Sequence, residues 1–554
     1  MGSVYNSSAS TAAILPDPQS QYDISRTVYG VALACGLWFC FIVAVQAIGT
    51  IQLYRKYSRI PQPAVSPTLR LDDVPHLTIL RPVKGLEPQL YECLAATFHQ
   101  TYPPQKLTIY FCVAASSDPA LPVLQRLLTD FPGFDARILI EEDDPYLAGL
   151  DGCSNLGPNP KIRNMSRGYR EAKGDVVWIM DCNVWVGKGV AGRMVDKLCG
   201  FEPGGIQTTP YKFVHQLPLV VASVGASAGE EARGLLQAHD PDGDEVPSNP
   251  SSPSGITRPC SRKGALSSLL RESGGRFEEM FMAIAHAKFY TAINTVSVAP
   301  CVVGKSNMFR RSHLDALTSS SPSYGPGIDF FSSNICEDHL IGDMLWRHPV
   351  PPSTTRYRNH CLLFGDLAIQ PMALMSVREY TARRVRWLRV RKWTVMLATF
   401  VEPGVEPLLC SAYGAFALST LPAIPLPHTW TTFSLFWIAI VMIWMLVDSF
   451  VYDKLHSGAS IELDANTPSF ARPPSQNRRR GLGEWIGAWL GREVLALPIW
   501  TWACYGGTTV VWRGKTFRVG IDMMVHEIGK EKKADSPEGD VGRAERRGSK
   551  DRIE

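Results

Sequence analysis

Two aspartates follow apolar segments that are typical of buried β-strands. Asp118 comes shortly after the segment at residues 107–114, and Asp181 directly follows the segment at residues 175–180. Polar residues beyond the carboxyl ends of parallel strands lie at the sheet edge where ligands bind. One carboxylate could hold a base or a ribose, and the other could ligate a divalent cation that neutralises a leaving diphosphate. Taken singly, each aspartate is more often a turn or helix-cap residue.

A third acidic group, Glu337-Asp338, precedes an amphipathic segment whose apolar residues share one helical face. The simpler interpretation is an acidic first turn that complements the helix dipole. A second interpretation makes Asp338 a general base, which removes a proton from a hydroxyl group as that group attacks. The adjacent Glu337 would help such a base, because neighbouring carboxylates raise each other's proton affinity.

The segment at residues 376–393 interleaves cations with tryptophan and leucine. A helix of this composition is typical of a membrane surface with anionic headgroups. Arginines that bind a leaving diphosphate would give the same pattern. The two interpretations are compatible, because an apolar block that could enter a membrane follows the segment. The cations are Arg383, Arg384, Arg386, Arg389, Arg391 and Lys392.

Other patterns exclude several kinds of function. The net charge of +4 is spread over 554 residues, which argues against a nucleic-acid binder. The 13 cysteines show no metal-ligand spacing, so they predict neither a zinc site nor a disulfide framework and favour a reducing compartment. Gly514-Lys515-Thr516 resembles the end of a P-loop, but Thr509 replaces the first required glycine and no βα turn precedes the segment.

The candidate residues must be positioned by residues 76–350, where strand-like and helix-like segments alternate. This order predicts an α/β fold with a mostly parallel sheet covered by helices. Residues 223–275 interrupt it with low-complexity sequence and are expected to be a disordered insertion. The expected strands are residues 76–80, 107–114, 136–140 and 175–180, and the helices are 88–100, 121–131 and 161–172.

Apolar blocks flank this central part. Residues 27–53 carry no formal charge and exceed the roughly 20 residues that cross a bilayer, although a buried core helix would also fit. No basic region of a signal peptide precedes them. Because three cations follow within six residues, the positive-inside rule predicts a lumenal arm at residues 1–26 and a cytosolic catalytic domain at residues 54–375.

The late part of the chain, residues 404–512, is expected to hold further membrane segments. Residues 430–451 predict a clear span. Residues 405–426 contain prolines and residues 485–511 contain charges, so these two could be spans, re-entrant segments or interfacial helices. Residues 513–554 are expected to be a tail that is largely disordered after residue 530.

The ordered motifs resemble those of the ceramide glucosyltransferases, membrane enzymes that make glucosylceramide from UDP-glucose. The resemblance runs from the first apolar block to about residue 520, without the insertion. It implies a GT-A-type nucleotide-sugar-binding domain with N-terminal and C-terminal transmembrane helices. The motifs are RPVKG at 81–85, DPA at 118–120, NPKIRN at 159–164, Asp181, CVVGKSNMFRR at 301–311, Glu337-Asp338 and RRVRW at 383–387.

The resemblance also implies roles for these residues. Asp118 and Asp181 would serve the UDP-sugar, Asp181 would ligate Mg²⁺ or Mn²⁺, and Asp338 would be the base. A full Asp-x-Asp pair is absent, because Cys182-Asn183 follows Asp181, and a metal would be held more weakly. The remaining implied residues are Arg383, Arg386 and Trp387 near diphosphate and acceptor, Lys84 and Lys161 near the donor, and His286 and Glu337 near the acceptor.

The expected reaction is transfer of glucose, with inversion, from UDP-glucose to the primary hydroxyl of ceramide. The expected partners are these two substrates and membrane lipids, and the expected place is the cytosolic face of the Golgi or ER as a multi-pass protein. The residues alone leave galactose open as the sugar. A processive polysaccharide synthase would need more spans, and a non-catalytic lipid-binding scaffold would tolerate loss of Asp181 and Asp338.

Overall fold

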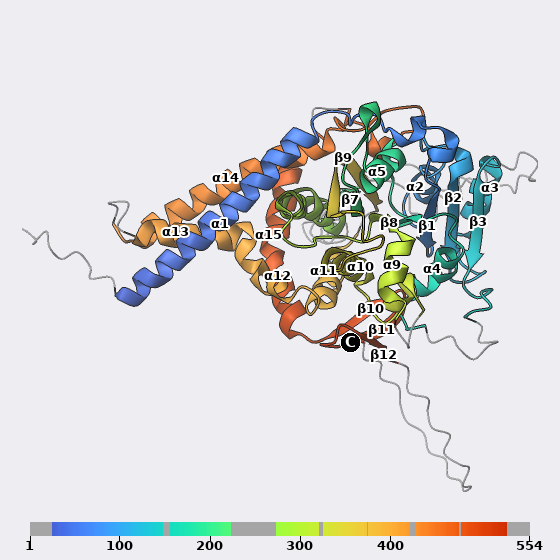
Figure 1. The fold of residues 1–554 in the computed structure, drawn as a ribbon. Helices are drawn as coiled ribbons and strands as arrows, with labels where there is room; N and C mark the ends of the chain where they lie inside the picture. The colour runs from blue at the N-terminus through green and yellow to red at the C-terminus, as the bar shows by residue number, and fades with distance from the viewer. Residues whose placement is uncertain are drawn as a thin grey trace, which may run out of the picture.

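The computed structural model describes residues 25–147, 156–222, 273–320, 325–373, 375–421, 427–475 and 478–528. Figure 1 shows an α/β body at one end and long helices that project together from the other end. Most of the predicted insertion at residues 223–275 and the predicted disordered tail lie outside the described residues. The last three residues of that range, 273–275, are helical, so the expected end of the insertion was wrong.

The body is built on a seven-stranded sheet with the order β3-β2-β1-β4-β8-β7-β9. The first four of these strands are parallel, β8 is antiparallel to both of its neighbours, and β9 is parallel to β7. This confirms the predicted mostly parallel sheet. The strands are β1 Leu77–Val83, β2 Leu107–Val113, β3 Asp135–Ile140, β4 Val176–Met180, β7 Tyr211–Ala222, β8 Ser306–Arg310 and β9 Arg358–Met372.

Helices cover both faces of the sheet, as its fully buried central strands require. The predicted helices after β1, β2 and β3 are confirmed, although the first is shorter than expected. The helices of the body are α2 Leu90–Ala95, α3 Leu121–Asp130, α4 Pro160–Arg170, α5 Val190–Cys199, α8 Ala287–Val296, α9 Arg311–Thr318, α10 Glu337–Arg347 and α11 Val377–Arg391.

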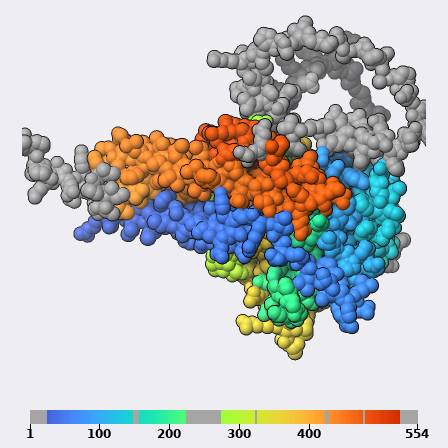
Figure 2. All heavy atoms as spheres, turned by 90° about the horizontal axis from the view of Figure 1, so that it is seen from above, coloured from blue at the N-terminus to red at the C-terminus, as the bar shows by residue number. Residues whose placement is uncertain are grey.

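Three helices form the projection: α1 Arg26–Lys56, α13 Pro407–Thr420 and α14 Trp430–His456. They lie side by side in both views (Figures 1 and 2). By length and apolar composition, α1 and α14 could each cross a membrane, which agrees with the predicted spans. With 14 residues, α13 is shorter than the roughly 20 residues that a span needs.

Buried ion pairs fix the projecting helices to the body. Lys288 of α8 contacts Asp448 of α14 at 2.5 Å, and both side chains are 1% exposed. The indole of Trp489, in α15 (Leu482–Tyr505), donates to the second oxygen of Asp448 at 2.8 Å. Arg492 of α15 contacts Glu406, the residue before α13, at 2.7 Å. The charges that made residues 485–511 ambiguous therefore face protein partners.

The chain beyond α15 forms a small antiparallel sheet, where the sequence predicted only a membrane segment followed by a tail. Its strands are β10 Thr509–Trp512, β11 Lys515–Val519 and β12 Val525–Glu527. Arg513 and Gly514 join β10 to β11 with φ angles of 51° and 80°, as a two-residue hairpin turn requires. The apolar side chains of this sheet pack on Ile335, Val390 and Trp393.

Candidate active site

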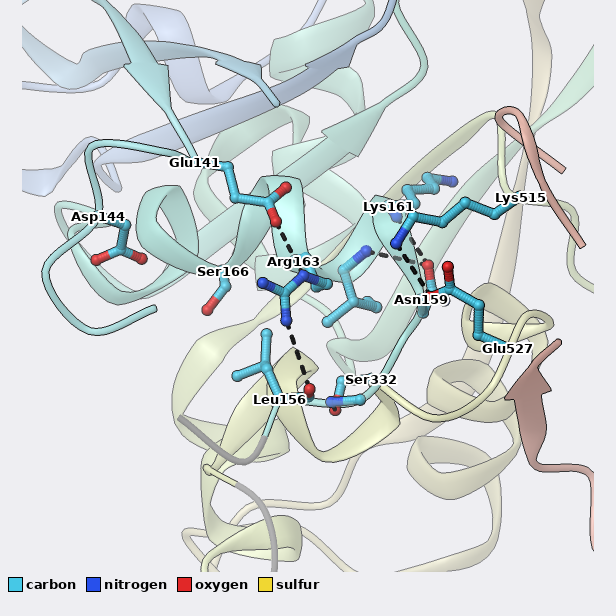
Figure 3. Close-up of polar contacts among 12 residues, drawn as sticks. Glu141, Asp144, Leu156, Asn159, Lys161, Arg163, Ser166, Ser332, Lys515 and Glu527 are labelled. Carbon is cyan, nitrogen blue, oxygen red and sulfur yellow. Dashed lines mark hydrogen bonds and ion pairs between the residues drawn. The ribbon is translucent and has the colours of Figure 1, made fainter. Parts of the chain in front are cut away.

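Lys161, in the first turn of α4, lies at the centre of the charged cluster. Its ammonium contacts Asp181 at 3.1 Å and Glu337 at 3.2 Å. Asn159 caps the helix, because its side-chain oxygen accepts from the Lys161 amide at 2.8 Å. Its side-chain amide also donates to Glu337 at 3.2 Å. The start of α4 therefore joins the residue after β4 to the start of α10. Figure 3 shows Asn159 and Lys161 at this position.

Asp181 follows β4 and lies between two lysines. Lys305, the residue before β8, contacts its second carboxylate oxygen at 2.9 Å. The antiparallel pairing of β4 and β8 brings the two residues together, because Met180 pairs with Ser306. Burial alone would raise the pKa of Asp181, but Lys161 and Lys305 hold it well below its usual range. Asp181 is therefore a stable anion.

Glu337 and Asp338 begin α10, as predicted. Burial raises the pKa of both carboxyls, and Lys161 offsets part of that effect. Gly304, the residue before Lys305, lies directly against Asp338: a Cβ atom built on this glycine would be 2.9 Å from the aspartate Cγ. Asp338 thus lies in the same cluster as Asp181, with a pKa shifted in the opposite direction.

Asp118 lies on the other side of the loop that follows β1. Both of its oxygens accept from the Gly85 amide, at 3.0 and 3.1 Å. Two residues further along that loop, Glu87 accepts from the side chain of Asn183 at 3.3 Å. The loop therefore connects Asp118 to the segment that begins with Asp181. Lys84, also in this loop, donates to the main-chain carbonyl of Arg513.

The basic helix α11 presents its predicted residues on different faces. Ser376 and Glu379 form a capping box at its start. Arg383 contacts the buried Glu278 at 2.9 Å and lies over the ring of Trp387, 4.9 Å from its centroid. Arg386 instead lines a cavity of about 700 Å³ between α11 and the C-terminal sheet. Burial and the neighbouring Arg383 lower the pKa of Arg386 to about 10.

His286 lies in a π-helical turn that runs directly into α8. Its ring stacks on Tyr290 at a centroid distance of 5.1 Å, and its Nδ1 is buried without a hydrogen-bond partner. Burial, Arg384 and Arg391 lower its pKa to about 3, so the imidazole is neutral. Burial raises the pKa of Tyr290, and the charge of Asp338 adds to that rise.

The structure thus joins Lys161, Asp181, Glu337 and Asp338 in one cluster and connects Asp118 and Lys84 to it through the loop after β1. Within the described part of the chain, no hydrogen bond or ion pair links Arg386 to these groups. The roles predicted for Arg383, Arg386, Trp387 and His286 stay predictions. The sequence interpretation missed Lys305, although the CVVGKSNMFRR motif contains it; its position beside Asp181 depends on a strand pairing that the sequence does not reveal.

A divalent cation at this site would need oxygen ligands near Asp181. Of the described residues, no three His, Cys, Asp or Glu side chains gather as a metal-binding group. However, the side-chain oxygen of Asn183 is buried without a partner two residues after Asp181. Carboxylate and amide oxygens are ligands that Mg²⁺ and Mn²⁺ accept. The site therefore fits a cation that takes its other ligands from a diphosphate and water.

Comparisons with known proteins identify the family of this chain. The family model described as Glycosyl transferase family 21 matches residues 36–233 and 267–525. The gap between the two matched parts falls within the predicted insertion. Among solved structures, a mannosyltransferase from Pyrobaculum calidifontis in complex with GDP-Man and Mn²⁺ aligns over 76% of this chain and 96% of its own. Its identity of 13% and TM-score of 0.38 make that likeness too distant to inform the chemistry.

Curated relatives match nearly the whole chain. The ceramide glucosyltransferase of Pyricularia oryzae is 51% identical over 90% of this chain and 95% of its own length. That of Gibberella zeae is 45% identical over 92% of this chain and 95% of its own. That of Candida albicans is 34% identical over 82% of this chain and 88% of its own length. The chain is therefore a glycosyltransferase of family 21 and belongs to the ceramide glucosyltransferase family.

Proposed function

We propose that this protein transfers glucose from UDP-glucose to the primary hydroxyl of ceramide, with inversion at the anomeric carbon. The observation that carries the proposal is the pair of partly buried aspartates, Asp181 and Asp338, beside Lys161. Asp181 has a lowered pKa and Asp338 a raised one. Divergent pKa values of this kind are typical of carboxyls with separate roles in one reaction. The names of the relatives support glucose and ceramide as the substrates.

In the proposed step, Asp338 accepts the proton of the ceramide hydroxyl while the oxygen attacks the anomeric carbon. The new carbon–oxygen bond forms as the bond between that carbon and the diphosphate oxygen breaks, and UDP departs with the electron pair. After burial, the charge of Asp181 also raises the pKa of Asp338, which supports its role as the base. A raised pKa brings the base closer to the pH at which the cell works.

The departing diphosphate needs positive charge, which the cluster can supply. Lys161 and Lys305 both lie on Asp181, and their ammonium groups can also donate to phosphate oxygens. A divalent cation held by Asp181 and Asn183 would neutralise further charge on the leaving group. Asp118 and Lys84 would hold the nucleotide on the far side of the loop after β1. Arg383, Arg386 and Trp387 would contact diphosphate and acceptor, and His286 would lie near ceramide.

A lipid acceptor agrees with the way in which the body is attached to its apolar helices. We assign α1 and α14 as membrane spans, with the body on the cytosolic side of the Golgi or ER membrane. The support is the charge pattern: α1 has Arg55 and Lys56 in its last turn, and α14 has Lys454 and His456 in its last turn. Ceramide would then reach the body from the bilayer, and UDP-glucose would reach it from the cytosol.

The test is the activity of an Asp338→Asn variant, purified in detergent and assayed with UDP-glucose and ceramide. Loss of the base should lower kcat by about 10²- to 10⁴-fold. The matched control is Asp343→Asn on the same helix, whose carboxylate pairs with Arg347 on the surface. Near-normal turnover by a folded Asp338→Asn variant would refute the base assignment. A long polymer as product, instead of a glycolipid, would favour a processive polysaccharide synthase.

A further inference from the structure

The small C-terminal sheet is attached to three parts of the body that carry candidate site residues. At the hairpin tip, the Arg513 carbonyl accepts from Lys84 of the loop after β1. At the other end of the sheet, the Val525 amide donates to Ser333 at 2.8 Å and Asn334 donates to Met523 at 2.9 Å. Ser333 and Asn334 lie a few residues before the Glu337-Asp338 pair.

The third attachment is to α11. The Arg389 guanidinium donates to the carbonyls of Thr509 and Gly506, each at 2.7 Å. The apolar core of the sheet, with Phe517 0% exposed, packs on Val390 and Trp393 of the same helix. The sheet therefore connects the loop after β1, the segment before the acidic helix α10, and the basic helix α11.

The hairpin tip places two cationic side chains near Lys84 of the loop after β1. Lys84, Arg513 and Lys515 lie close enough that the last two help burial to lower the pKa of Lys84, against the pull of Asp118. Burial raises the pKa of the thiol of Cys182, the residue after Asp181, and the charge of Arg513 opposes that rise. Lys515 has a counter-charge, Glu527 at 3.0 Å. Within the described residues, no carboxylate pairs with the Arg513 side chain, which lies over Trp512 at 5.7 Å.

An arginine beside other cations and without a carboxylate partner of its own is unfavourable unless an anion binds there, and Arg513 is in that position. From this arrangement we propose that the hairpin tip forms a wall of the donor site, where Arg513 binds the diphosphate of the nucleotide sugar. This inference rests on the proposed function and adds a residue to its donor site. A guanidinium suits the task, because its planar donors match two phosphate oxygens and keep their charge.

The experiment measures UDP and uridine binding to the full chain in detergent. Arg513→Asn removes the charge but keeps the turn, because asparagine tolerates the positive φ of 51° and Asn-Gly is a favoured hairpin pair. The matched control is Arg518→Gln, an exposed arginine of β11 between the buried Phe517 and Val519. Both variants lose one positive charge from the same hairpin.

We expect Arg513→Asn to weaken UDP binding by about 10- to 100-fold, the loss typical of a hydrogen bond to a charged group. Uridine binding and the KM for ceramide should stay within about twofold of wild type, and so should every constant of Arg518→Gln. Equal loss of UDP and uridine binding, or equal losses in both variants, would overturn the assignment. Unchanged UDP binding by Arg513→Asn would do the same, whereas a wild-type chain that binds no UDP would refute the proposed donor itself.

Discussion

Replacing Gly304 by Ala should damage catalysis while leaving the fold intact. The added Cβ would stand 2.9 Å from Cγ of Asp338 and 3.1 Å from its Oδ2, whereas ordinary contact begins at 3.4 Å. The carboxyl group must therefore move by about 0.5 Å, which is the tolerance within which a catalytic group keeps its productive geometry. A displacement of about 1 Å can cost about 10²-fold in rate. We expect kcat to fall by about 10- to 100-fold.

The assay is glucose transfer to ceramide in detergent, with kcat and both KM values measured, together with thermal unfolding. We expect a large change in kcat and a smaller one in stability. Overpacking by one methyl group costs about 1–3 kcal/mol of the free energy of unfolding. Gly133→Ala is the control, since a Cβ there meets no atom within 4 Å. A folded Gly304→Ala variant with wild-type kcat would show that the position of Asp338 does not limit the reaction.

Asp448→Asn should cost about 3–5 kcal/mol in thermal unfolding, because it leaves the ammonium of its partner in α8 buried without a counter-charge. Asp453→Asn, which breaks the partly exposed pair between Asp453 of the same helix and Arg478, should cost at most about 1 kcal/mol. The rate should fall as pH falls through the raised pKa of Asp338, and Lys161→Gln should move this acid limb to higher pH, as a pH–rate profile would show. Asn183→Ala should raise the Mn²⁺ concentration for half-maximal activity about 10-fold in a metal titration.

The sequence predicted the parts of the fold that local patterns encode. Apolar segments predicted β1, β2 and β4, because strands buried on both faces are apolar throughout. The shorter apolar segment at residues 136–140 predicted β3, which lies at the sheet edge and is only partly buried. The start of α10 at Glu337 followed from an acidic first turn before an amphipathic segment. The start of α4 fits its Asn-Pro pair, in which Asn159 caps the helix and proline follows.

Contacts between distant segments could not be predicted in the same way. Lys305 lies on Asp181 because β8 pairs with β4 across more than a hundred residues, and no periodicity reveals such a register. The hairpin at residues 509–519 was missed because its strands follow an apolar block and were counted with it. The Arg513-Gly514 turn was the available signal, since a glycine between two short β-prone segments favours a hairpin.

The charge cluster explains why two carboxyls so close together can take different roles. Both Asp181 and Asp338 are partly buried, and the loss of solvent raises the pKa of each. Asp181 has a lysine on each oxygen, so attraction outweighs burial and it stays charged. Lys161 also bonds Glu337, and that divided attraction leaves burial dominant at Asp338. Hence one aspartate suits the binding of cationic groups and the other suits the acceptance of a proton.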